Sequence, residues 1–198
     1  MTQKERMEQG LLYQPSDPEL KQMRLQVQQL LQKYNRLIPA DSNERSELIY
    51  KILGQVGDGC SIYPPFFCDY GVHITVGKNF FANIGCIILD VAPVEIGDDV
   101  FLGPNVQIIT ASHPLEPDLR AKGYGLGKPV SIGNQVWIGA GAIINPGITI
   151  GDGAVIGSGS VVTRNIPEHV VAAGNPCRVI RGIGESSTKG GVHFETET

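Results

Sequence analysis

The chain has 198 residues, a formal net charge of −4 and a hydrophobic fraction of 41%. This composition allows a buried core, excludes a disordered chain and argues against nucleic acid as a partner. No apolar run is long enough to span a bilayer, and the polar start from Met1 to Gln9 is unlike a signal peptide, so we expect a cytoplasmic protein with no membrane partner. None of the four cysteines forms a C-x-x-C pair, so we expect no metal.

Residues 1–55 are expected to form a small helical cap. Ser16 to Glu19 resembles a capping box, with Pro18 near the first helical position. Apolar residues then recur at helical spacing as far as Tyr34, which predicts one helix, and a second helix is expected from about Asp41 to Leu53. Repeat folds need such caps to cover the open end of the core.

Residues 56–183 carry a repeat of six residues. Its apolar positions, eleven of twelve being Val, Ile or Leu, are Val76, Ala82, Ile88, Ile96, Leu102, Ile108, Ile132, Ile138, Ile144, Ile150, Ile156 and Val162. A period of six does not fit the 3.6-residue repeat of an amphipathic helix, whereas a short strand followed by a turn fits it. The pattern predicts an all-β domain that forms a parallel β-helix of hexapeptides.

The residue after each apolar position has a longer period. Glycine stands there in the first hexad of each set, at Gly77, Gly97, Gly133 and Gly151. It recurs in the middle hexads, at Gly103, Gly139 and Gly157, and Asn83 is the exception. Three hexads therefore form one coil of 18 residues, which predicts a triangular prism. We expect glycine at these corners because it adopts a positive φ at little cost.

The repeat lapses between residues 114 and 131, where charged residues, glycine and proline replace a coil. Loops of this length in compact domains are usually functional or disordered, so we expect an excursion loop. Residues 184–198 are rich in Gly, Ser, Thr and Glu and are expected to form a disordered tail.

His113 is the candidate catalytic residue because it ends its coil at the root of the excursion loop. A neutral imidazole there can act as a general base near pH 7, although a lone corner histidine is more often merely solvated. Asn83 is either a left-handed corner residue or an amide directed at a ligand. These two residues lie at different corners of the prism, so they can meet only between neighbouring chains, which suggests a site shared in a trimer.

Two arginines follow the last coil. Arg178 and Arg181 are either exposed residues that form surface salt bridges or the anchor of an anionic ligand beside the prism.

Several short motifs accompany the repeat: Leu12-Tyr13, Asp69-Tyr-Gly71, Gly77-Lys-Asn-Phe-Phe-Ala-Asn83, Gly103-Pro-Asn105, His113-Pro114, Val136-Trp-Ile-Gly139 and Asn145-Pro-Gly147. With the helical cap and the loop, they resemble the hexapeptide-repeat acetyltransferases of the maltose O-acetyltransferase and galactoside O-acetyltransferase group. The resemblance extends from Met1 to about Ile183. The hexads alone mark only the superfamily, and the combination is more specific.

The resemblance implies a left-handed parallel β-helix and a homotrimer with active sites between subunits. It implies transfer of acetyl from acetyl-CoA to a hydroxyl group of a sugar such as maltose, glucose or a galactoside. His113 would be the general base, and Asn83 would contact the acceptor and the developing oxyanion. The implied acceptor-binding residues are Asp17, Asp69, Asn83 and Asp90, and the implied acetyl-CoA-binding residues are Ala140, Ser158, Thr163, Arg164, Arg178 and Arg181.

Two positions depart from the family's pattern, and other functions stay open. Phe81 stands where related enzymes often have Tyr, and Ala140 where some have Ser. The first alternative is an acyltransferase whose acceptor is serine, an antibiotic or a lipo-oligosaccharide. A γ-type carbonic anhydrase has the same fold but needs three zinc-binding histidines, and only His113 is well placed. A non-catalytic scaffold is the third alternative, which a failure to bind coenzyme A would favour.

Overall fold

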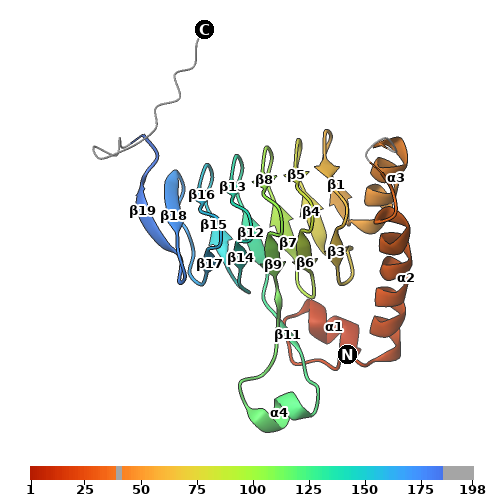
Figure 1. Ribbon diagram of the computed structural model, residues 1–198. Helices are drawn as coiled ribbons and strands as arrows, with labels where there is room; N and C mark the ends of the chain where they lie inside the picture. Colours follow the sequence, from red (N-terminus) through yellow and green to blue (C-terminus); the bar gives the residue numbers. More distant parts are fainter. Residues whose placement is uncertain (39–41, 185–198) are drawn as a thin grey trace.

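The computed structural model describes residues 1–38 and 42–184, and most of its strands have two or three residues (Figure 1). One sheet contains β1 (Gln55–Val56), β4 (Ile74–Val76), β7 (Val94–Ile96), β12 (Val130–Ile132) and β15 (Thr149–Ile150). A second contains β2 (Ser61–Ile62), β5 (Phe81–Ala82), β8 (Phe101–Leu102), β13 (Trp137–Ile138), β16 (Val155–Ile156), β18 (Val170–Ala173) and β19 (Arg178–Gly182). A third contains β3 (Phe67–Cys68), β6 (Ile87–Leu89), β9 (Gln107–Ile109), β14 (Ile143–Ile144) and β17 (Val161–Val162).

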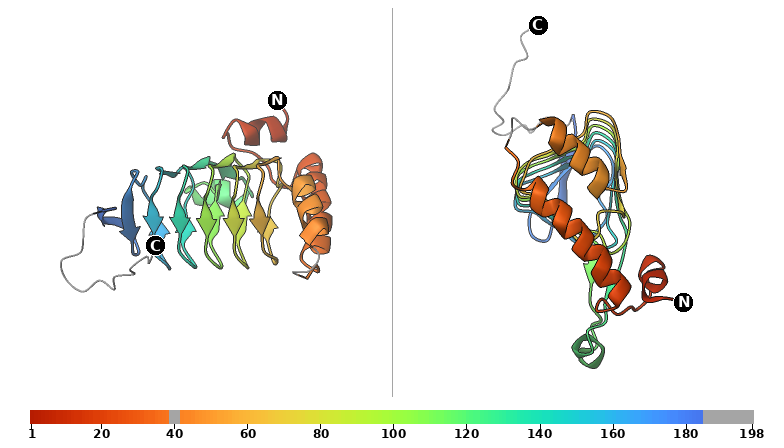
Figure 2. Two further views of the ribbon diagram at one scale, coloured as in Figure 1. Left: turned by 90° about the horizontal axis from the view of Figure 1, so that it is seen from above. Right: turned by 90° about the vertical axis from the view of Figure 1, so that its right-hand side faces the viewer.

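Consecutive strands from β1 to β9 lie in the first, second and third sheets in turn, so the sheets form the sides of a triangular solenoid (Figure 2). The parallel register joins residues one coil apart: Ile132 pairs with Ile150, and Ile144 pairs with Val162. This register confirms the predicted coil of 18 residues only after the loop. Before the loop a coil has 20 residues, since Val76 pairs with Ile96 and Phe81 pairs with Phe101. The fold is a left-handed parallel β-helix with an N-terminal helical cap, as predicted.

The core is a stack of aliphatic side chains inside the solenoid. All twelve repeat positions are buried, and none is more than 3% exposed. The position two residues before each of them also points inward, and Phe80, Val100 and Val136 are fully buried there. Each Val, Leu, Ile or Phe side chain among them stabilises the fold by about 1.5–3 kcal/mol through burial, so every coil adds an apolar layer to the stack.

The corner glycines are needed for a reason that differs from the expected one. A positive φ occurs two residues later, at Asn79 and Gln135, with values of 55° and 56°. The expectation that the corner glycines adopt a positive φ is therefore wrong. A Cβ atom on Gly97 would lie 2.8 Å from the carbonyl carbon and oxygen of Gly133 in the next coil. Glycine is required there because the backbones of successive coils approach closely.

The helical cap consists of α1 (Gln3–Glu8), α2 (Pro18–Tyr34) and α3 (Ser42–Ile52). Helices α2 and α3 lie across one open end of the solenoid (Figure 2). Tyr34 is fully buried there, and its hydroxyl group donates a hydrogen bond to the carbonyl oxygen of Ile62. The side chain of Asn35 exchanges two hydrogen bonds, of 2.8 and 2.9 Å, with the backbone of Phe66. These contacts fix the cap on the first coil.

The start of α2 differs from the prediction. Asp17, and not Ser16, is the N-cap residue, and its carboxylate accepts a hydrogen bond of 3.0 Å from the N–H of Glu19. Because Pro18 occupies the first helical position, the residue directly before it becomes the N-cap. A capping box does occur, between Thr2 and Glu5 at the start of α1.

The excursion loop leaves the solenoid after β9 (Figure 1). Strands β10 (Ala111–Ser112) and β11 (Leu126–Gly127) pair as an antiparallel hairpin, and α4 (Pro117–Ala121) lies at its tip. The chain rejoins the first sheet at Val130, where β12 pairs with β7. The loop is thus ordered, and the solenoid resumes slightly before the expected end of the loop at residue 131.

The other end of the solenoid is closed by the antiparallel pair of β18 and β19. The expected disordered tail, 184–198, lies outside the described residues apart from Gly184. Over residues 1–38 and 42–184, no helix has both the length and the apolar character needed to cross a membrane.

Candidate active site

His113 directly follows β10 at the root of the excursion loop, and its side chain is exposed. Its Nδ1 atom is 2.9 Å from the carbonyl oxygen of Tyr124 on the returning side of the loop. Because a carbonyl oxygen only accepts hydrogen bonds, Nδ1 carries the proton of the neutral ring. The lone pair on Nε2 can then accept a proton from a ligand, which is the state that a general base needs.

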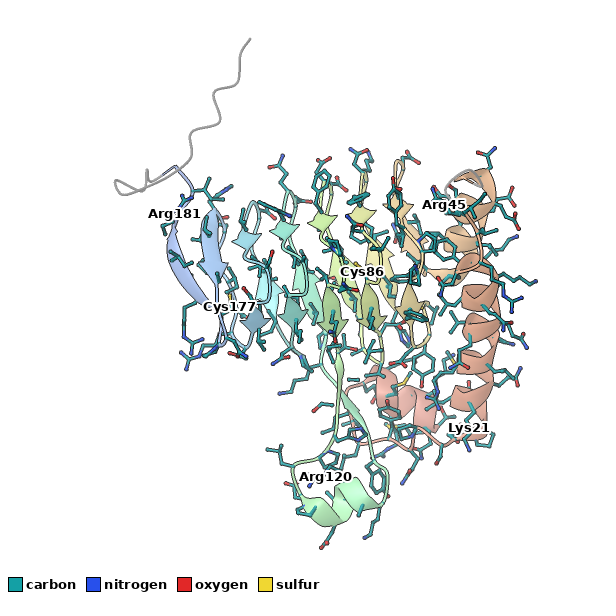
Figure 3. All side chains as sticks on the ribbon, in the orientation of Figure 1. Lys21, Arg45, Cys86, Arg120, Cys177 and Arg181 are labelled. Atoms are coloured by element: carbon teal, nitrogen blue, oxygen red, sulfur yellow. The ribbon has the colours of Figure 1, made fainter. Side chains whose placement is uncertain are left out.

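Arg120 holds the loop in its folded form. This residue belongs to α4, and its Nη1 atom donates hydrogen bonds of 3.0 and 2.9 Å to the carbonyl oxygens of Pro114 and Leu115. The guanidinium group therefore closes the turn that follows His113. Figure 3 shows Arg120 within the loop, away from the body of the solenoid.

Asp90 lies at the same corner as His113, one coil nearer the cap, since it follows β6 as the loop follows β9. Its side chain is fully buried. Oδ1 accepts hydrogen bonds from the N–H groups of Asp69 and Tyr70 at 3.0 and 2.9 Å, and Oδ2 accepts one from that of His73 at 3.3 Å. Direct contact between Asp90 and an acceptor, which the resemblance implied, does not fit this burial. Asp90 instead shapes the turn of residues 69–73.

Burial makes Asp90 sensitive to pH. It raises the pKa of the Asp90 carboxyl group from an ordinary value of 3.8 to about 6, although the N–H of Tyr70 and the charge of His73 oppose the shift. The folded protein therefore binds this proton more tightly than the unfolded chain does. The resulting stabilisation is complete below about pH 4 and is lost as the pH rises through about 6.

The variant Asp90→Asn removes this titration. The free energy of unfolding of the wild type, relative to that of the variant, should fall between about pH 4 and pH 6, by at most about 1.4 kcal/mol per pH unit, and should level off above that range. Urea unfolding of both proteins at a series of pH values measures the difference. A difference that stays constant with pH would show that Asp90 does not titrate as the structure indicates.

Asp69 and Arg24 are charged groups beside this turn. Burial raises the pKa of the half-buried Asp69, and the nearby Arg24 opposes the shift. Arg24 donates hydrogen bonds to the hydroxyl group of Tyr70, at 2.5 Å, and to the carbonyl oxygen of Pro15. The segment before α2 is thereby joined to the solenoid. Asp17 lies in this segment, where its carboxylate is engaged as the helix cap.

Asn83 follows β5 at the corner between the second and third sheets, whereas His113 lies beyond the far end of the third sheet. One side of the solenoid, on the order of 15–20 Å at the rise of an extended strand, separates them within a chain. Oδ1 of Asn83 accepts a hydrogen bond of 2.8 Å from the N–H of Ile84, so its Nδ2 group is left as a donor. The structure thus does not bring the two candidate catalytic residues together within one chain.

A shelf of small residues continues along the corner of Asn83. Ala140 and Ser158 are exposed there, after β13 and β16, and the N–H of Gly159 donates a hydrogen bond of 2.8 Å to the carbonyl oxygen of Ala140. A Cβ atom on Gly139 would lie 2.6 Å from the backbone nitrogen of Ser158, so only glycine allows the coils to stack so closely. Trp137 on β13 is 56% exposed beside this shelf.

Arg178 and Arg181 lie on β19, the last strand of the second sheet, and Figure 3 shows Arg181 at the end of the solenoid opposite the cap. Arg178 pairs in register with Ala173. A Cβ atom on Gly157 would lie 2.7 Å from the Cβ atom of Ala173, so the corner of Ser158 and the start of β19 are neighbours. Arg178 therefore extends the shelf beyond the last coil, whereas Arg181 pairs with Val171 and lies toward the opposite end of this side of the solenoid.

Most of the candidate residues fall into two groups. We call the first the His113 corner: Asp69, Asp90, His113, Thr163 and Arg164, each of which follows a strand of the third sheet or the hairpin that leaves it. We call the second the Asn83 corner: Asn83, Ala140, Ser158 and Arg178. Arg181, toward the other end of β19, and Asp17, at the start of α2, belong to neither group. Among the described residues, no group of three or more His, Cys, Asp or Glu is arranged to hold a metal ion.

Three further residues that contact the His113 corner or its loop were not predicted from the sequence. The carbonyl oxygen of Tyr124 and the guanidinium groups of Arg24 and Arg120 have no pattern that marks them. Their partners lie on other segments, so the contacts become visible only when the loop and the cap are folded.

Known proteins share this architecture. Residues 6–57 match the maltose acetyltransferase hexapeptide capping motif, and residues 129–164 match the bacterial transferase hexapeptide model of six repeats. The galactoside O-acetyltransferase of Escherichia coli is 42% identical over 93% of this chain and 91% of its own.

Solved structures agree. A maltose O-acetyltransferase from Clostridium difficile superimposes with a TM-score of 0.91 at 49% identity, over 92% of this chain and 98% of its own. A galactoside acetyltransferase in complex with coenzyme A superimposes with a TM-score of 0.89 at 43% identity, over 92% of each chain.

A β-helix of hexapeptides with this cap defines a class of transferases. The chain belongs to the hexapeptide-repeat acetyltransferase family, in the group of the maltose and galactoside O-acetyltransferases. It is an enzyme, and the reaction of its family is acetyl transfer to oxygen.

Proposed function

We propose that the protein transfers an acetyl group from acetyl-CoA to a hydroxyl group of a sugar, in sites between the subunits of a homotrimer. The observation that carries this proposal is the hydrogen bond from Nδ1 of His113 to Tyr124, which leaves Nε2 free to accept a proton. The names of the similar proteins support the donor and the acceptor, since one of them was solved with coenzyme A and they are named for maltose and galactosides.

The reaction proceeds by direct transfer. Nε2 of His113 takes the proton of the acceptor hydroxyl group as its oxygen attacks the thioester carbonyl of acetyl-CoA, and a C–O bond forms. The negative charge moves to the former carbonyl oxygen, where the Nδ2 group of Asn83 donates a hydrogen bond to it. The C–S bond then breaks, and the imidazolium of His113 returns the proton to the leaving sulfur. The products are the acetylated sugar and coenzyme A.

The trimer follows from the separation of the two corners. Asn83 and His113 stand at opposite ends of the third sheet, so one chain cannot bring both to a single reacting carbonyl. Heterologous contacts around a threefold axis form a closed ring, and they place the Asn83 corner of one chain against the His113 corner of its neighbour. Three equivalent sites result.

The two ends of each site have different chemistry. The small residues Ala140 and Ser158 leave room for the pantetheine arm against the backbone, and Arg178 and Arg181 pair with phosphate groups. Thr163 and Arg164 face this groove from the neighbouring chain. Asp69, with Arg24 beside it, accepts hydrogen bonds from the sugar hydroxyl groups, and Asp17 at the start of α2 contributes a second carboxylate.

A thiol reagent that detects released coenzyme A tests the acceptor. The purified protein receives acetyl-CoA and one of maltose, glucose, a galactoside, serine or chloramphenicol. We expect a sugar to raise thiol release at least about tenfold over the rate with water alone, because the ordered acceptor replaces a diffusing one. Thiol release that depends on serine or chloramphenicol, and not on any sugar, would show that the acceptor is an amino acid or an antibiotic instead of a sugar. Failure to bind acetyl-CoA would favour the alternative that the protein is a non-catalytic scaffold.

A further inference from the structure

A third segment pairs with the hairpin that carries His113. The N–H of Tyr13 donates to the carbonyl oxygen of Gly125 at 3.1 Å, and the N–H of Gly125 donates to the carbonyl oxygen of Tyr13 at 2.9 Å. Gly125 directly follows Tyr124, whose carbonyl oxygen accepts the hydrogen bond from His113. The segment around Tyr13 is therefore joined by an isolated antiparallel bridge to Gly125, the residue before β11, on the side away from β10.

The ring of Tyr13 anchors this bridged segment. It is only 3% exposed and packs in a small core with Met7, Leu20, Tyr70 and Val91, separate from the core of the solenoid. A Cβ atom on Gly125 would lie 3.0 Å from Cε1 and Cζ of the Tyr13 ring. The ring thus packs directly against the backbone that holds the partner of His113.

Neighbouring contacts hold the same segment in place. The N–H of Gln14 donates a hydrogen bond of 2.8 Å to Oε1 of Gln3, and its Nε2 atom donates one of 3.3 Å to the carbonyl oxygen of Lys122. Arg24 donates to the carbonyl oxygen of Pro15. The segment is therefore tied to α1 and α2 on one side and to the loop on the other.

A hairpin with two residues in each strand is at best marginally stable in water, so it needs further packing. The bridged segment supplies two backbone hydrogen bonds and the buried ring of Tyr13. We propose that Tyr13 is a positioning residue for His113: its two backbone hydrogen bonds to Gly125 and its buried ring hold the Tyr124 carbonyl oxygen against Nδ1, and so keep Nε2 unprotonated and directed at the acceptor. The catalytic consequence rests on the proposed function, whereas the effect on the ring of His113 does not. A misplacement of about 1 Å near a reacting group can lower a rate about 10²-fold.

Kinetics separate positioning from a merely structural role. In Tyr13→Ala, kcat should fall by about 10- to 100-fold, with the KM for acetyl-CoA within about twofold of the wild type, since the Asn83 corner is untouched. Tyr13→Phe keeps the ring and should restore kcat. Tyr34→Ala is the matched control, because Tyr34 is equally buried but packs in the solenoid core. This control should lower the stability and leave kcat within about twofold.

The nitrogen-15 chemical shifts of the His113 ring test the proposal without any acetyl transfer. We expect one neutral tautomer with the proton on Nδ1 in the wild type, and a mixture of tautomers in Tyr13→Ala. If Tyr13→Ala does not fold, Gly125→Ala replaces it as the test. Its new Cβ atom would lie 3.0 Å from the Tyr13 ring and 3.1 Å from Cγ of Pro15, so it pushes both from the loop side without opening the core. The proposal is overturned if the foldable variant keeps the single tautomer and the wild-type kcat, or if Tyr34→Ala lowers kcat equally.

Discussion

Replacement of His113 by Gln should lower kcat for acetyl transfer by about 10²–10⁴-fold, the usual contribution of a general base. Glutamine is similar in size and polarity, but its amide group cannot take a proton from the acceptor hydroxyl. The KM for acetyl-CoA should stay within about threefold, because the cosubstrate rests mainly on the Asn83 corner. Thiol release with saturating sugar measures kcat, and a titration of acetyl-CoA measures KM.

The matched control is His169→Gln. His169 is exposed at a corner with a φ of 54°, and Gln135 adopts a φ of 56° at the same place two coils earlier, so glutamine fits there. This control should keep the activity of the wild type. A kcat for His113→Gln within about threefold of the wild type would remove the general base from the proposed mechanism.

The solenoid was predictable because its physics is local and repeats. Each of the twelve repeat positions from Val76 to Val162 obeys one requirement, an apolar side chain of limited size. The coil length, 20 residues before the loop and 18 after it, fixes the register. The corner glycines show the limit of this reasoning. Glycine is favoured both where φ is positive and where two backbones approach closely, and the sequence cannot distinguish these two causes. In the structure, Asn79 and Gln135 adopt the positive φ instead.

The candidate site was predictable only in part. His113 stood out because it ends a coil where the repeat stops, and the two corners followed from counting hexads. The burial of Asp90 could not be predicted, because an aspartate at a corner has the same sequence pattern whether it faces solvent or binds the N–H groups of a turn. The contact of Tyr13 with Gly125 depends on how the cap and the loop fold toward each other, and no repeat encodes it.

The central claim is that each active site takes His113 from one subunit and Asn83 from its neighbour. It is tested by mixing two variants, His113→Gln and Asn83→Ala, each of which should be nearly inactive by itself. Unfolding and joint refolding, or co-expression with two affinity tags, produces mixed trimers. Chance assembly of equal amounts combines an intact His113 with an intact Asn83 in about one site in four.

The measurement is thiol release by the mixed trimers, compared with the wild type at an equal concentration of sites. The account predicts that about a quarter of the wild-type activity returns, far above the sum of the two separate variants. A mixture that is no more active than that sum, although both tags co-purify, would contradict a site shared between subunits.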